Sequence, residues 1–310
     1  MVVPFPLEGR VPLLSLSALG RDFLDNAQVF SDQLTDWGFM AFELPGIRNR
    51  TDELRTAFEE ACESKDPSLG EYEYTVVPQL SAGGSHGYFA EATEVPRLSG
   101  GVPDPKEFIH VSGAMIDDTP SGAGGMLRAF PELASKANDV FKIGFDLAEG
   151  FGRLLSGILG PLSPGLGLSR ELSILRVIHY MNTEGREVLA HEHSGIQMLG
   201  IQFPPSDGGL QYVLHDGTWV EPVLSGTDVV LCNIGRMLTF ASNGRFRPST
   251  HRVHTDQSSH EYERWSTVMF LHADHDARQW RLTGGGLERP EGTWGEFVAE
   301  RARGLGIAHE

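Results

Sequence analysis

Two histidines stand two residues apart in the apolar segment VLAHEHSGIQMLGIQ, from Val188 to Gln202. The run of alternating and apolar residues around them is typical of a buried strand. Residues i and i+2 of a strand project from the same face, so His191 and His193 point together while Glu192 points away. Two imidazoles on one face are candidate metal ligands. Ordinary polar residues at the mouth of a barrel would give the same pattern, so further ligands are needed to decide.

Further residues of this kind follow downstream, where STHRVHT supplies His251 and RWS supplies Arg264 and Ser266. His251 could close a three-ligand site. Arg264 and Ser266 share one face of the next strand, and a guanidinium beside a hydroxyl suits a carboxylate that is held bidentately. A structural salt bridge is the alternative role for Arg264. In the upstream strand LRVIHYMN, Tyr180 can offer its hydroxyl to the same anion.

Taken in order along the chain, these segments resemble the isopenicillin N synthase-like branch of the iron and 2-oxoglutarate-dependent oxygenases. The resemblance covers nearly the whole chain. It rests on VPLLSL, WGFMAFELPGI, HGYF, KEFIHVSG, LRVIHY, GGLQYVLHDGTWVEPV, DVVLCNIGRMLTFASNGRFRPSTHRV and RWS. It implies a double-stranded β-helix, or jelly roll, in which a His-x-Asp...His triad binds ferrous iron.

The resemblance also implies roles for particular residues. His191 is the first metal ligand and His251 the distal one. Arg264 and Ser266 hold 2-oxoglutarate with help from Tyr180, and the metal chelates the same co-substrate.

The sequence departs from the family at His193, which stands where the carboxylate of the triad belongs. His193 could ligate the metal and give a site of three neutral imidazoles, which suits iron, copper, zinc and nickel alike. It could instead swing away and leave a two-histidine site with an extra open position, or the site could be catalytically degenerate. Two literal His-x-Asp triplets, at His254 and His272, lack a later histidine followed by Arg-x-Ser, so we interpret them as unrelated to the metal.

A set of pocket residues follows from the same comparison and from shared strand faces. An inward Arg176 could pair with a substrate carboxylate. For each of these residues a packing role is as open as a substrate contact. They are His86, Tyr88, Phe108, Arg176, Ile178, Phe270 and His272.

The surrounding elements must position these residues. Residues 1–125 read as an N-terminal α/β and loop region, rich in Gly, Pro and Ser after residue 64. Residues 126–310 read as one structural unit, with a long helix, short strands over 172–271 and a C-terminal helix. Glycines inside the long helix would let a neighbouring element approach closely. We therefore predict a mainly β protein with flanking helices and a jelly-roll core, the N-terminal region packing on that core.

The composition of the chain limits the classes of molecule that it could bind. The chain has 310 residues, 40% of them hydrophobic, and a formal net charge of -17. That charge would repel nucleic acid and anionic membranes, and no segment reads as a signal peptide or a membrane span. We expect a cytoplasmic protein that acts on a small molecule. Cys62 and Cys232 are expected to be reduced thiols because they lack disulfide or metal spacing.

The predicted function is that of a non-haem oxygenase that uses Fe(II), 2-oxoglutarate and O2 to oxidise a C–H bond of a small molecule, such as a secondary metabolite. Hydroxylation, desaturation and cyclisation are all open. Two alternatives remain from different classes. One is an iron-dependent oxidase or dioxygenase that works without 2-oxoglutarate, and the other is a catalytically inactive small-molecule binding barrel.

Overall fold

The structure of the protein is a computed structural model. It describes residues 2–5, 14–15, 30–32, 34–63, 86–91, 100–117, 125–161, 163–181, 183, 185–255 and 263–305. Much of the predicted loop region between residues 64 and 125 lies outside these ranges. Asp256, the acidic member of one His-x-Asp triplet, lies outside them too.

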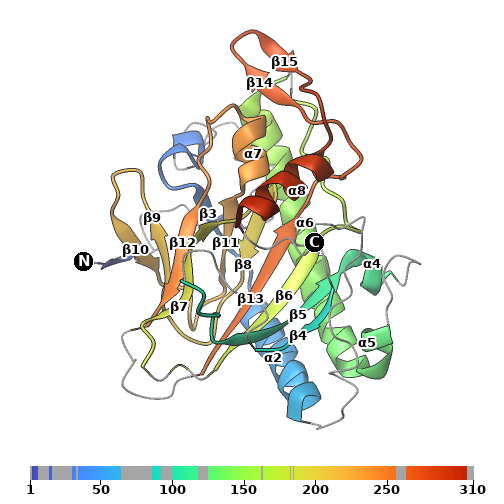
Figure 1. Ribbon diagram of the computed structural model, residues 1–310, viewed down its shortest axis with the longest axis vertical. Coiled ribbons are helices and arrows are strands. Elements are labelled where there is room, and N and C mark those ends of the chain that lie inside the picture. Colours follow the sequence, from blue (N-terminus) through green and yellow to red (C-terminus); the bar gives the residue numbers. More distant parts are fainter. Residues whose placement is uncertain are drawn as a thin grey trace.

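Two facing sheets form the centre of the molecule, with helices on the outside (Figure 1). The major sheet has the strand order β2 (Leu14–Ser15), β3 (Phe39–Glu43), β11 (Val229–Ile234), β8 (Leu199–Gln202), β13 (Arg264–Leu271), β6 (Ile174–Tyr180), β5 (Lys106–Ser112), β4 (Gly87–Phe89). The minor sheet has the order β1 (Val2–Phe5), β10 (Trp219–Pro222), β9 (Leu210–Val213), β12 (Thr250–His254), β7 (Val188–Ser194). A hairpin of β14 (Arg281–Thr283) and β15 (Gly286–Glu288) stands apart.

The helices cover the outer face of the major sheet and one end of the molecule. Figure 1 shows α2 and α6 against the major sheet, and α7 and α8 near the β14–β15 hairpin. Their bounds are α2 Ile47–Glu63, α4 Gly113–Ile116, α5 Gly125–Ala129, α6 Pro131–Leu159, α7 Arg236–Ala241 and α8 Trp294–Leu305.

Successive residues of the major sheet alternate between two apolar cores, as the two-residue period of a strand requires. In β13, Trp265 and Met269 belong to the core beneath α6, whereas Val268 belongs to the core between the sheets. The inner core also takes Ile178 from β6 and Tyr212 from the minor sheet. This arrangement confirms the predicted mainly β class with flanking helices.

The predicted long helix, whose sequence ends in GILG, is α6. It begins with proline in its first turn, where a missing N–H costs nothing, and it ends at Gly160 with φ of 95°. At Gly144 a Cβ would lie 2.7 Å from Met269 Sδ and 2.9 Å from Phe203 Cζ. The glycine thus lets the helix approach the sheet closely, as predicted.

Strands from both halves of the chain share the major sheet. β3 and β5 precede residue 126, yet they pair with β11 and β6 from the second half, and β4 pairs with β5. A domain boundary near residue 125 stays a prediction.

Both cysteines carry free thiols. Across the described part of the chain, no helix has the length and apolar character needed to cross a bilayer.

Replacing Gly144 with alanine tests the close contact between α6 and the sheet. We expect a loss of about 1–3 kcal/mol in the free energy of unfolding, because the added methyl group overpacks Met269 and Phe203. Gly157→Ala is the matched control, since Gly157 is an exposed residue of the same helix and alanine there should stabilise by up to about 1 kcal/mol. Urea unfolding measures both. Equal stabilities of the two variants would contradict the packing argument.

Candidate functional site

Two of the three predicted metal ligands lie side by side on the minor sheet. His193 of β7 and His251 of β12 are direct partners in the antiparallel register, so their side chains share a face. Their ring centroids are 4.4 Å apart. The register shifts just after His251, where a β-bulge or irregularity interrupts the pairing of the two strands.

The third predicted ligand, His191, contacts a buried carboxylate. Its Nδ1 lies 3.2 Å from Oδ1 of Asp104, whose side chain is 3% exposed. The other oxygen, Oδ2, accepts a hydrogen bond of 2.9 Å from Nζ of Lys106. Asp104 precedes β5 of the major sheet, so its carboxylate links one sheet to a histidine of the other.

The Nδ1 atoms of all three histidines face oxygen acceptors. His251 Nδ1 is 3.0 Å from the carbonyl oxygen of Ser249, and His193 Nδ1 is 2.7 Å from that of His191. A carbonyl oxygen only accepts, so Nδ1 carries the hydrogen, and in the neutral form of the ring Nε2 keeps its lone pair. Nε2 of His191 and Nε2 of His251 have no hydrogen-bond partner among the described residues. Histidines that ligate a metal use the same arrangement, in which one ring nitrogen donates to an acceptor and the other binds the ion.

Burial keeps His251 uncharged. Desolvation of the ring and the neighbouring His193 together lower the pKa of His251 to about 3, although its hydrogen bond to Ser249 acts in the opposite direction. The imidazole is therefore neutral at pH 7, the form that a metal ion requires.

The described residues contain no assembled group of three or more His, Cys, Asp or Glu side chains that could hold a metal ion. The structure brings His193 and His251 together, while the ring of His191 rests on Asp104. The donor set nonetheless fits a metal that accepts imidazole, because the Nδ1 atom of each histidine is engaged by an acceptor.

The predicted co-substrate residues share the space between the sheets. Arg264 is paired with Tyr180 across β13 and β6, and Ser266 is paired with Ile178. Arg264 is 1% exposed, donates from Nε to the carbonyl oxygen of Gly208 at 2.7 Å, and lies 5.5 Å from the centre of the Tyr180 ring. Burial raises the pKa of Tyr180, so its hydroxyl stays protonated and able to donate.

Two further polar side chains in this core were not predicted. The hydroxyl of Tyr212 and both amide atoms of Asn233 are buried and have no hydrogen-bond partner within the described residues. The Tyr212 ring lies 5.3 Å from that of His251 and 4.8 Å from that of Phe39. Buried polar groups are normally hydrogen-bonded, so these two are placed to contact a polar ligand.

The sequence held a partial signal for these missed residues. Tyr212 follows the apolar Leu210 by two residues in LQYV, and Asn233 follows Leu231 by two residues in VVLCNI. Residues two apart share a strand face, so both polar side chains lie on the inner face with these leucines. Asp104 had no such signal, because it lies in the segment PDPKEF, 87 positions before His191 in the sequence.

Most of the predicted pocket residues lie around Arg176. Its Nε donates to Nε2 of His110 at 2.6 Å, and its guanidinium carbon lies 4.2 Å from the Phe108 ring centre and 5.2 Å from that of Phe270. Ile178 is in the same inner core. The structure thus gathers these four predicted residues, Phe108, Arg176, Ile178 and Phe270, between the sheets.

The other three predicted pocket residues lie elsewhere. Tyr88 packs on the outer core and its hydroxyl donates to Glu107, on the opposite face of β5 from Phe108. His86 is buried, and neither of its ring nitrogens has a partner among the described residues. His272 is also buried, with its ring 5.5 Å from that of His275.

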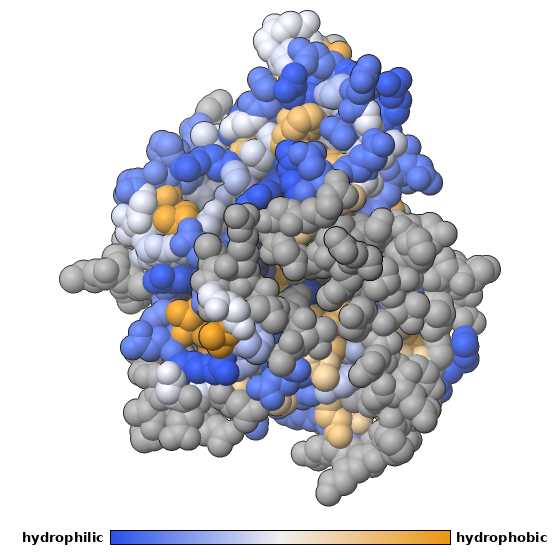
Figure 2. All heavy atoms as spheres, viewed as in Figure 1, coloured by the Kyte–Doolittle hydropathy of each residue, from blue (hydrophilic) through white to orange (hydrophobic). Residues whose placement is uncertain are grey.

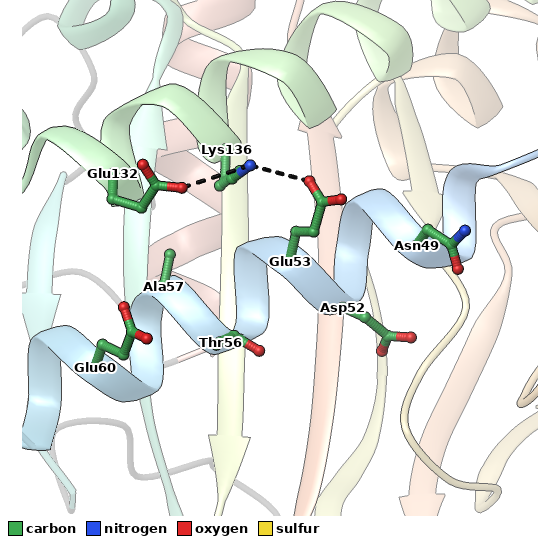
Figure 3. A pocket seen from close by; sticks show the side chains of 8 residues that line it. All are labelled: Asn49, Asp52, Glu53, Thr56, Ala57, Glu60, Glu132 and Lys136. Carbon is green, nitrogen blue, oxygen red and sulfur yellow. Dashed lines mark hydrogen bonds and ion pairs between the residues drawn. The ribbon is translucent and has the colours of Figure 1, made fainter.

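A separate cavity of about 520 Å³ lies on the outer surface between α2 and α6 (Figure 3). Its basic residue, Lys136, is held between Glu53 at 3.1 Å and Glu132 at 3.5 Å. No histidine is among the described residues that line it. This cavity is therefore a poor candidate for the predicted chemistry.

Comparison with known sequences shows what part of the chain is similar to. Residues 171–273 match the 2OG-Fe(II) oxygenase superfamily. A gibberellin 2-beta-dioxygenase of Phaseolus coccineus is 38% identical over 65 residues, which cover 21% of this chain and 19% of that protein. A probable flavonol synthase 5 of Arabidopsis thaliana is 33% identical over 118 residues, covering 34% and 36%. The alignments thus span well under two thirds of these two relatives.

Solved structures share the fold over nearly the whole chain. A putative 2OG-Fe(II) oxygenase family protein of Caulobacter crescentus is 22% identical with a TM-score of 0.73, covering 98% of this chain and all of the other. A full-length Neurospora crassa protein in complex with alpha-KG is 19% identical with a TM-score of 0.71, covering 96% and 97%. At these identities the likeness shows the fold, and it confirms the predicted jelly-roll core.

All six predicted ligand and co-substrate residues fall within the matched region: Tyr180, His191, His193, His251, Arg264 and Ser266. The matched region and the names of these relatives agree with the expected dioxygenase class and with the expected cofactors, Fe(II), 2-oxoglutarate and O2. Over residues 171–273 the chain is therefore similar to the 2OG-Fe(II) oxygenase superfamily, and it shares the fold of the solved structures over nearly its whole length.

Proposed function

We propose that this chain oxidises a C–H bond of a small molecule, with three histidines as metal ligands in place of the usual two histidines and one carboxylate. The observation that carries the proposal is the engagement of all three Nδ1 atoms by oxygen acceptors. Names of relatives refer to gibberellin and flavonol, which supports a small-molecule substrate.

His191, His193 and His251 would hold the ferrous ion. Bound with 2-oxoglutarate and O2, the ion supplies the oxidising power for hydroxylation, desaturation or ring closure. Burial keeps the imidazole of His251 neutral, and the acceptors at Nδ1 fix the ring orientation of all three histidines. Among the three interpretations of His193, ligation is favoured by its ring lying against that of His251.

Arg264, Ser266 and Tyr180 would orient the co-substrate. The guanidinium pairs with a carboxylate of 2-oxoglutarate, and the hydroxyls of Ser266 and Tyr180 donate to the same group. The surrounding inner core excludes water. Such a site contributes mainly by positioning the reactants and by keeping solvent out.

The substrate would lie against the inner residues that the co-substrate does not use. Arg176 offers a cation between two aromatic rings, and Tyr212 and Asn233 offer polar groups that have no partner in the described part of the chain. These groups suit a molecule that carries both an apolar body and polar substituents.

Anaerobic titration with Fe(II), with and without 2-oxoglutarate, tests the proposed function. We expect a visible charge-transfer band when both are present, because the metal chelates the co-substrate. The band should be lost in His251→Ala. Arg264→Ala should mainly weaken the affinity for 2-oxoglutarate, by roughly tenfold to a hundredfold for a charged hydrogen-bonded pair. Unchanged binding in both variants would rule out the assigned roles.

Oxygen uptake separates the proposal from the oxidase alternative. The proposed enzyme consumes O2 only when 2-oxoglutarate is added, and forms succinate in equal amount. Uptake that is independent of 2-oxoglutarate would instead favour an oxidase in which Arg264 holds a substrate carboxylate. Absence of metal binding would favour the inactive binding barrel.

Replacing Asp104 with asparagine tests whether this carboxylate orients His191. We expect metal affinity to fall by roughly 10–100-fold, the usual effect of losing such a partner of a ligating histidine. Titration with Co(II), followed by its visible absorption, measures affinity without turnover. Asp117→Asn is the control, since Asp117 pairs with Arg170 at the surface. Equal affinities in the two variants would show that Asp104 has no such role.

A further inference from the structure

A second cavity, of about 610 Å³, opens among α7, α8, β14 and the adjoining ends of β7 and β12. Figure 2 shows this end of the molecule mainly in hydrophilic colours, with a few hydrophobic residues between them. The cavity is lined by Ser194, Arg236, Thr239, Phe240, Asn243, Gly244, Pro248, Thr250, Arg281 and Arg301.

The charge of this cavity is opposite to that of the whole chain. Three arginines line it, Arg236, Arg281 and Arg301, and no acidic residue is among its described lining. The chain as a whole has a formal net charge of -17. The cavity between α2 and α6 has the reverse character, with four acidic residues and one lysine (Figure 3). A local excess of arginines in an acidic protein needs a physical reason.

The hydrogen bonds of the arginines leave part of their donor capacity unused. Arg236 donates from Nε to Ser194 Oγ at 2.9 Å and forms no ion pair with any described residue. Arg281 pairs with Glu288 at 2.7 Å, yet its Nε is buried and has no partner among the described residues. Among the described residues, Arg301 forms an ion pair only with the exposed Glu300, at 3.4 Å.

The arginines also repel one another. Burial, and then the nearby charge of Arg301, lower the pKa of Arg236. Holding like charges together in a partly buried site is unfavourable, and an anion placed between them would remove that cost.

An aromatic ring completes the lining. The guanidinium carbon of Arg281 lies 5.6 Å from the centre of the Phe240 ring. Arg301 stacks 3.6 Å from the centre of the Phe297 ring, which holds its guanidinium in place. The volume exceeds that of a simple inorganic ion, and Phe240 can contact an apolar body.

We propose that this cavity binds a small organic anion, with Arg236, Arg281 and Arg301 around its carboxylate or phosphate group and Phe240 against its apolar part. The site is separate from the Arg264 site in sequence and in the elements that form it. Its walls include Ser194 and Thr250, which pair with each other and directly adjoin His193 and His251. A bound anion would therefore lie next to the strand ends that carry two of the proposed metal ligands. The binding claim itself does not depend on the proposed function.

Calorimetric titration of the full chain with benzoate, phenyl phosphate and the neutral benzamide tests the proposal. We expect at least one anion to bind and benzamide not to bind. Whichever anion binds more tightly identifies a carboxylate or a phosphate as the preferred group. Arg236→Gln and Arg301→Gln should each weaken the binding by roughly tenfold or more, since each removes a charged donor.

Two control variants keep this result specific. Arg153→Gln removes the same charge from an exposed position of α6 and should leave the affinity unchanged. Arg264→Ala should also leave it unchanged, because Arg264 belongs to the other anion site. Equal binding of benzamide would overturn the proposal. Loss of anion binding in Arg264→Ala together with full binding in Arg236→Gln and Arg301→Gln would overturn it as well.

Discussion

The register of β13 between β6 and β8 is the constraint on which the co-substrate site depends. In the observed register Arg264 lies between the sheets, opposite Tyr180, while Trp265 packs against Phe58 of α2. A shift of one residue would exchange the two faces. It would bury a guanidinium among hydrocarbon, at a cost on the order of several kcal/mol or more. The outer packing of Trp265 and Met269 thus determines where the arginine points, although neither residue touches the inner site.

The histidine site depends on a different kind of link. β7 and β12 belong to the minor sheet, and β5 belongs to the major one. Asp104, just before β5, reaches His191 with one carboxylate oxygen and Lys106 with the other. A polar contact between buried groups therefore joins the two sheets at the site itself. Removing Asp104 would take its carboxylate from both His191 and Lys106 at once, so this one residue carries the link.

The sequence alone predicted the features that depend on the two-residue period of a strand. Alternation predicted that Arg264 and Ser266 share a face, and that Tyr180 faces the same space. It could not predict contacts that depend on tertiary register. Phe89 pairs with Phe108 of β5 on the inner face, so its neighbour Tyr88 points to the outer face. Asp104 comes from a loop whose path no local pattern defines. The interruption of the pairing after His251 likewise has no sequence signature.

Asp104 also changes the electrostatic consequence of His193. Three neutral imidazoles leave the full double charge on a divalent ion, whereas the usual carboxylate would reduce it by one. Asp104 supplies a negative charge behind His191, but Lys106 shares it. A charge beyond the ligand raises the basicity of the imidazole without occupying a coordination position. If His193 ligates, the site therefore keeps the same number of protein ligands as the usual triad and transfers part of the carboxylate's role to a residue far away in sequence. Because imidazole suits several divalent metals, that outer charge and the co-substrate, rather than the histidines alone, would have to favour iron.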